Sequence, residues 1–181
     1  MHVLLHAGSL RGEPQYEPVH VEDTGNGVLR LLASPGLAYD VAAGDAIRVD
    51  AAGKYEVVER AGNLSVRVYS KQPIGDRVDD LVTRLEAVQG VLDGRVTGGA
   101  VFTVPAQGRV SRVRRLMVEF VAVHRDCIWE FGNVYDEQGV PLEWCRDLLS
   151  ASGLAVPRSD ATPVLSVCRR VLTGTRSRAA E

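Results

Sequence analysis

The chain has 181 residues, of which 45% are hydrophobic and 24% charged, and its formal net charge is −2. These values are typical of a globular protein that buries a core, and they exclude a collagen-like chain, a long coiled coil and a wholly disordered chain. At about 100–200 residues per domain, the length fits one large domain or two small ones.

Residues 1–62 are predicted to form a small antiparallel β-barrel or roll, because short apolar stretches alternate with turns. The Asn26-Gly27 pair favours a hairpin, since both residues accept positive φ angles. Residues 8–14 are predicted to be a mobile, turn-rich segment. Short strands are expected at 3–5, 18–22, 28–32, 46–50 and 54–60, with a loop at 33–39.

Residues 63–135 predict a second unit of strands and helices. Apolar residues recur at helical spacing after Asp76, a candidate N-cap, up to Gly90, and again over 109–125. The order of elements is that of the ferredoxin-like split βαβ motif, with both helices on one face of a four-stranded antiparallel sheet. Its strands are expected at 64–70, 91–96, 100–104 and 127–131.

Residues 136–181 predict a helical extension. Apolar residues at helical spacing indicate helices at 141–149 and 163–172. The polar residues from 174 onward are expected to fray. The sequence therefore divides into three segments, 1–62, 63–135 and 136–181.

The three cysteines predict reduced thiols, because an odd and scattered set is not a disulfide framework. They are Cys127, Cys145 and Cys168. The first residues lack the basic stretch and long apolar run of a signal peptide, and no segment reaches the ~18–20 apolar residues of a membrane span. We therefore expect a cytoplasmic protein.

Short motifs follow one another over about two thirds of the chain. They are the strand Val28-Leu29-Arg30-Leu31, the bend Ser34-Pro35, the pair Gly44-Asp45, the run Gly62-Asn63-Leu64-Ser65-Val66-Arg67-Val68 and the ending Trp129-Glu130-Phe131. In this order, with a helix, a hairpin and a second helix before the last motif, they resemble the bacterial family named domain of unknown function 4265. The resemblance covers about residues 19–135, and it implies no activity and supplies no catalytic residues.

Asp45 and Arg67 are the first candidate binding residues. The Gly44-Asp45 pair could form a ligand loop, or it could be a turn in which the carboxylate accepts backbone N–H groups. Arg67 lies in a predicted strand beside Ser65 and Tyr69, where it could clamp a carboxylate or phosphate. The alternative is an arginine that faces solvent or forms an ordinary ion pair.

Tyr69 and Trp129 could form an aromatic surface if both point away from the helices. Such a surface stacks bases in the RNA-binding version of the split βαβ fold. The alternative is that residues 1–60 or the C-terminal helices cover this face, because an exposed apolar sheet is a liability. A separate basic patch is expected at Arg112 and Arg115 on the second helix, as a site for phosphate or an acidic protein or as a solvated helix face.

No catalytic triad, cofactor loop or metal-ligand spacing stands out in the sequence, so we predict no cofactor, no metal site and no catalytic residue. His20 lies near Glu22 and Asp23, but nothing in the pattern makes these side chains converge on an ion. The first hypothesis is therefore a non-catalytic protein, monomer or homodimer, that binds a protein partner as a regulator or an immunity-type inhibitor.

Two alternatives belong to other functional classes. One is a nucleic-acid-binding protein that uses the basic helix 109–125 or the sheet face, with a steep salt dependence. The other is an enzyme or small-ligand-binding protein with its site between the two folded units, near Asp45, Arg67 or His20. That reading predicts a concave pocket with perturbed carboxylates at the seam.

Overall fold

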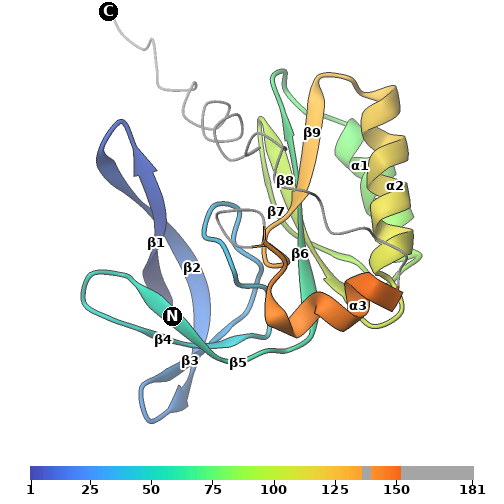
Figure 1. The fold of residues 1–181 in the computed structure, drawn as a ribbon. Coiled ribbons are helices and arrows are strands. Elements are labelled where there is room, and N and C mark those ends of the chain that lie inside the picture. Colours follow the sequence, from blue (N-terminus) through green and yellow to red (C-terminus); the bar gives the residue numbers. More distant parts are fainter. Residues whose placement is uncertain (136–139, 152–181) are drawn as a thin grey trace, which may run out of the picture.

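A computed structural model describes residues 1–135 and 140–151, which form two antiparallel sheets with helices beside the second (Figure 1). The first sheet has the strand order β1-β2-β3-β4-β5. Its strands are β1 His2–Leu10, β2 Glu13–Gly25, β3 Val28–Leu31, β4 Ala46–Val49 and β5 Tyr55–Glu59. The prediction of an α+β chain with antiparallel sheets is thereby confirmed.

The second sheet has the order β7-β8-β6-β9. Its strands are β6 Asn63–Ser70, β7 Val91–Val96, β8 Gly99–Pro105 and β9 Cys127–Phe131. The helices are α1 Arg77–Glu86, α2 Val110–Val123, the short 3-10 helix η1 Glu143–Cys145 and α3 Arg146–Ala151. No helix in these described ranges is long and apolar enough to cross a membrane.

The expected barrel is wrong, because the first sheet stays open within the described residues. β5 does not pair with β1, although the turn between β4 and β5 lies beside β1, where the His6 N–H donates to the Gly53 carbonyl at 2.8 Å. β4 and β5 have four and five residues. The sheet has four strand pairings, and these short strands do not supply the fifth one, between β5 and β1, that would close it.

The expected turn-rich segment at 8–14 is also wrong, since β1 and β2 form one long hairpin. Arg11 and Gly12 make its two-residue turn with φ angles of 54° and 87°. Gly8, at φ 93°, lies where the strand register shifts between His6 and Ser9. Gly8 looks like a strand breaker in the sequence, but a β-bulge accommodates it within β1.

The main core lies between the second sheet and its helices. Leu64, Val66 and Val68 alternate along β6 and point toward α1 and α2, which cover the sheet face away from the first sheet (Figure 1). The helices contribute Val78, Leu81, Leu85, Val113, Met117 and Phe120. Burial of each such side chain stabilises the fold by roughly 1.5–3 kcal/mol relative to exposure. Because this stabilisation requires apolar residues on one face of each helix, the helical periodicity of the sequence predicts both helices.

The ends of α1 differ from the predicted ones. Asp76 has helical backbone angles and no side-chain capping hydrogen bond. At the other end, Gln89 takes the left-handed conformation at φ 62°, and the N–H of Gly90 donates to the Leu85 carbonyl. The Arg77 side chain fastens the start of the helix instead, through Asp126 at 2.8 Å and Ser70 at 3.1 Å.

We expect this fastening to make stability depend on pH below 4. The Arg77 guanidinium and the Ser70 hydroxyl lower the pKa of Asp126 from 3.8 to about 2. Because the folded-state pKa is the lower one, the stabilisation is fully present above the unfolded-state pKa and is lost as the pH falls toward 2. In urea unfolding, Asp126→Asn should flatten the stability profile between these values; a profile as steep as that of wild type would contradict the assignment.

The segment after β9 packs against the main core. Cys145 and Leu149 are buried there, and the Trp144 indole N–H donates to the Asn133 carbonyl at 3.0 Å. The helix expected at 141–149 is therefore present as η1 followed by α3. The helix expected at 163–172, Cys168 and the expected frayed tail lie outside the described residues.

Candidate functional site

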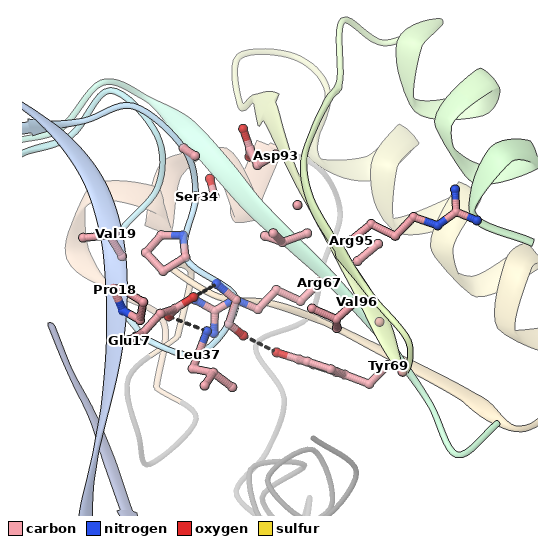
Figure 2. Close-up of a pocket in the computed structure, with 18 of the residues that line it drawn as sticks. Glu17, Pro18, Val19, Ser34, Leu37, Arg67, Tyr69, Asp93, Arg95 and Val96 are labelled. Atoms are coloured by element: carbon pink, nitrogen blue, oxygen red, sulfur yellow. Dashed lines mark hydrogen bonds between the residues drawn. The ribbon is translucent and has the colours of Figure 1, made fainter. Parts of the chain in front are cut away.

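The two sheets meet across the loop 33–44 between β3 and β4. From the first sheet, the Glu17 carboxylate on β2 accepts the backbone N–H groups of Gly36, Leu37 and Ala38, at 2.7, 2.8 and 2.8 Å. From the second sheet, the Tyr69 hydroxyl on β6 donates to the Gly36 carbonyl at 2.8 Å (Figure 2). The loop backbone is thus held from both sides.

Arg67 completes this grip, and we call Glu17, Arg67 and Tyr69 the loop clasp. Its guanidinium donates to the Ala38 carbonyl and lies 3.7 Å from the Glu130 carboxylate. The side chain is 0% exposed and stacks on the Tyr39 ring at 4.7 Å. Burial acts to lower the pKa of Arg67, but Tyr69 and Glu130 raise it overall, so the group stays charged.

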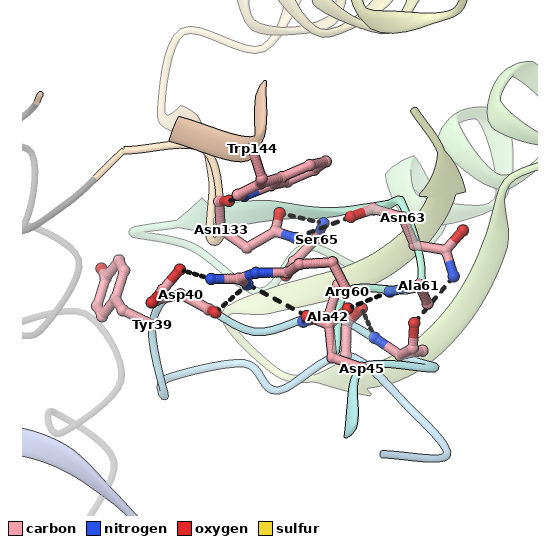
Figure 3. A network of polar contacts seen from close by, with 12 residues as sticks. Tyr39, Asp40, Ala42, Asp45, Arg60, Ala61, Asn63, Ser65, Asn133 and Trp144 are labelled. Atoms are coloured by element: carbon pink, nitrogen blue, oxygen red, sulfur yellow. Dashed lines mark hydrogen bonds and ion pairs between the residues drawn. The ribbon is translucent and has the colours of Figure 1, made fainter. Parts of the chain in front are cut away.

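Asp45 fastens the other end of the loop. Its carboxylate accepts the N–H groups of Ala42 and Ala61, at 3.0 and 2.8 Å, and lies 3.3 Å from the Arg60 guanidinium (Figure 3). The side chain is 1% exposed. Burial raises the pKa of Asp45, while these hydrogen bonds and Arg60 act to lower it. Of the two roles considered for the Gly44-Asp45 pair, the structure shows the turn in which the Asp45 carboxylate accepts backbone N–H groups.

Asn133 joins the end of β9 to the start of β6 in the same network. Its side-chain oxygen accepts the Ser65 N–H and its amide donates to the Asn63 carbonyl, both at 2.8 Å (Figure 3). Gly132 packs so closely on Arg67 that a Cβ there would lie 2.5 Å from the guanidinium carbon. Sequence reasoning missed Glu17, Glu130 and Asn133, because their partners are backbone groups or residues distant in the chain.

The predicted aromatic surface of Tyr69 and Trp129 does not form. The strand register pairs Tyr69 with Ile128 and Val68 with Trp129. Side chains alternate between the faces of a sheet, so Tyr69 faces the loop while Trp129 packs against the helix-side core. The two aromatic side chains would share a face only if β9 were shifted by one residue along β6, so that Trp129 paired with Tyr69.

Arg112 and Arg115 lie apart from the seam. Both are exposed on α2, in the helix layer on the far side of the second sheet (Figure 1). Neither makes an ion pair with an acidic residue within ranges 1–135 and 140–151. The six candidate residues therefore divide among three places: the seam, the helix-side core and the outer helix surface.

Beside the clasp lies a cleft of about 550 Å³. One wall comes from β2 and the loop 33–37, and the other comes from the β7–β8 hairpin over residues 93–101 (Figure 2). Apolar side chains dominate its surface, namely Pro18, Val19, Ala33, Pro35, Leu37, Val96, Ala100 and Val101. A concave, mainly apolar cleft of this size is typical of small-molecule sites.

Asp93 supplies a carboxylate at one end of this cleft. The Thr103 hydroxyl donates to it, and the Ser34 hydroxyl lies 2.6 Å from that of Thr103. The N–H of Ala43 donates to Ser34 in turn, at 3.0 Å. Asp93 was missed in the sequence; the available signal was an acidic residue inside a predicted strand, next to Gly94.

Comparisons with known proteins agree with this architecture. A solved structure titled "Novel crystal structure of a hypothetical protein from Neisseria gonorrhoeae" is similar, with a TM-score of 0.58 and 12% identity over 72% of this chain and 91% of that one. At this identity the similarity concerns the fold alone. No curated protein matches the sequence significantly. The family model described as Domain of unknown function (DUF4265) matches residues 17–129, which confirms the resemblance, and the chain belongs to that family.

Proposed function

We propose that this protein binds a small molecule with an apolar body in the cleft between its two sheets. The observation that carries the proposal is the cleft itself, whose volume of about 550 Å³ lies within the usual range of ligand sites. Its walls are mainly apolar, and its polar groups are gathered at a few points.

The way in which the walls are held supports the proposal. Glu17 and Tyr69 fix the backbone of residues 36–38, so the loop wall is ordered before any ligand arrives. The opposite wall belongs to a hairpin paired with β6. A preformed site avoids the cost of ordering a loop on binding, which leaves more of the contact energy for affinity.

Straight-chain alcohols from butanol to octanol test the proposal. Each methylene buried against the apolar walls contributes about 0.8 kcal/mol, so affinity should rise about fourfold per carbon until the cleft is full. Val101 is 8% exposed, lies opposite Arg67 in the register and lines the cleft. Val101→Phe should fill the space and weaken octanol binding at least tenfold in calorimetry.

Val58→Phe is the matched control, because Val58 is exposed on β5 outside the cleft. It adds the same ring and should leave octanol binding unchanged. Thermal unfolding of both variants shows that they are folded. Affinity that does not depend on chain length, or that responds equally to both substitutions, would sink the proposal.

We also infer a ferredoxin-like arrangement for the second unit. Support comes from the element order β6-α1-β7-β8-α2-β9, from the strand order β7-β8-β6-β9, and from the packing of both long helices on one core. β6, the first strand of this unit, lies inside the sheet between β8 and β9, as the first strand does in the split βαβ motif.

A protein partner that binds at Arg112 and Arg115 is the second candidate. The specific observation is that both arginines lie in the first half of α2, where the helix dipole is also positive and no acidic residue occupies the first turn. An acidic partner would relieve this concentration of positive charge. Binding there would weaken steeply with added salt, whereas binding of an alcohol in the apolar cleft would not.

A further inference from the structure

We propose that the ligand of the cleft carries a positively charged nitrogen, an ammonium or amidinium group, that binds to Asp93. This inference rests on the proposed function and specifies the chemical class of the ligand. It follows from the charges at the seam, where Asp93 is the carboxylate for which the described chain supplies no counter-charge.

The surroundings of Asp93 consist of hydroxyl and backbone groups. Thr103 and Ser34 form a chain of hydroxyls that begins at the Ala43 N–H and ends at one carboxylate oxygen of Asp93. Burial raises the pKa of Asp93, while Thr103 and Ser34 act to lower it. Hydrogen bonds of this kind orient a carboxylate, but they leave its negative charge uncompensated in a partly desolvated place.

The other acidic groups of the seam are differently placed. Asp45 lies 3.3 Å from Arg60, and Glu130 lies 3.7 Å from Arg67. Glu17 accepts three backbone N–H groups and lies close enough to Arg67 to raise the pKa of that arginine. In contrast, no arginine or lysine within residues 1–135 and 140–151 forms an ion pair with Asp93.

The nearest arginine along the strand points elsewhere. Arg95 lies two residues after Asp93, but the register of β7 shifts between Leu92 and Gly94. The Arg95 guanidinium binds Asp79 on α1 at 2.9 Å and the Gly75 carbonyl, away from the Asp93 end of the cleft (Figure 2). The bulge therefore separates a cation and an anion that lie close together in sequence.

These positions define how a ligand would lie. Its charged nitrogen would donate to Asp93 at one end, and its apolar body would lie along Pro35, Leu37 and Val96 in the rest of the cleft. A charge-assisted hydrogen bond in a partly buried place is stronger than one between neutral groups. We therefore expect the amine group to contribute at least tenfold to affinity over a neutral group of equal size.

The experiment compares straight-chain primary amines with alcohols of the same chain length, butyl to octyl, on the full chain by calorimetry at pH 7. In the wild type each amine should bind at least tenfold more tightly than its alcohol. In Asp93→Asn that ratio should fall to about one, with alcohol binding kept. The control Glu56→Gln, which removes an equal charge from an exposed pair on β5, should keep the wild-type ratio.

The outcomes separate the inference from the proposed function. Amines and alcohols that bind the wild type equally would overturn the inference while the cleft remains a binding site. Failure of both series to bind would overturn the proposed function and the inference together. An amine preference that persists in Asp93→Asn would also overturn the inference, because the charged nitrogen would then bind elsewhere; thermal unfolding shows that this variant is folded.

Discussion

Replacing Arg67 with alanine is expected to lower the free energy of unfolding by about 3–5 kcal/mol, measured by urea denaturation at pH 7. The guanidinium is fully buried between the sheets. Its removal leaves the Glu130 carboxylate, which is only 13% exposed, without its cation and the Ala38 carbonyl without its donor. It also leaves a cavity under Tyr39 and Gly132.

Arg48→Ala is the matched control, because it also removes an arginine from an ion pair. Arg48 lies 3.4 Å from Glu56, but both side chains are more than half exposed, and such a pair contributes about 0–1 kcal/mol. The account requires a large difference between the two variants. If Arg67→Ala were as mild as Arg48→Ala, the clasp would not hold the sheets together.

Glu17→Ala is expected to cost about 3 kcal/mol or more, since three backbone N–H groups lose one charged acceptor. A hydrogen bond to a charged group contributes roughly 1.5–3 kcal/mol, and an unsatisfied buried donor costs a further 1–3 kcal/mol, reduced here where water reaches the loop. The amides of Gly36, Leu37 and Ala38 should exchange their hydrogens faster by about 100-fold. Hydrogen exchange followed by NMR measures each of them.

Two further variants sharpen that experiment. Glu13→Ala removes an exposed carboxylate from the same strand and should leave the exchange of the three amides unchanged. Glu17→Gln keeps the shape but replaces one acceptor oxygen by a donor, so it should fall between the wild type and the alanine variant. Rates in Glu17→Ala close to those of Glu13→Ala would show that the loop is held by other contacts.

The helix-side core could be predicted because it follows a simple period. Val66 and Val68 alternate with polar residues on β6, and Leu81 and Leu85 recur at helical spacing, so one face of each element is apolar in the sequence itself. Burial of that face follows directly from the hydrophobic effect. The six helices and strands from β6 to β9 accordingly agree with expectation to within a few residues.

On the other face of β6, the periodicity of the sequence does not predict what the side chains contact. Ser65, Arg67 and Tyr69 are polar and alternate, which in a single sequence looks like a solvent-facing side. The loop covers this face, and its backbone carbonyls accept hydrogen bonds from Arg67 and Tyr69 in the place of water. The sequence pattern shows that this face of β6 is polar. It does not show that the polar side chains bind the backbone of a loop, because only the tertiary fold brings that loop to the face.

The site could be predicted in outline only. The hypothesis of a site between the two units names Asp45, Arg67 and His20. Arg67 and His20 line the cleft, whereas Asp45 does not. Asp93 and Glu17 were not foreseen, because their roles depend on a bulge in β7 and on a loop that crosses between sheets. Neither feature has a recognisable residue spacing in the sequence. A bulge is a single extra residue in one strand, and the path of a loop depends on tertiary contacts.

The most direct test of the binding cleft is an NMR titration of the full, ¹⁵N-labelled chain with hexylamine. The account predicts that chemical-shift changes concentrate in residues 33–37 and 93–101, which form the two walls, and that these changes disappear in Val101→Phe. Changes concentrated instead around Arg112 and Arg115 on α2, or spread evenly over the chain, would contradict the account.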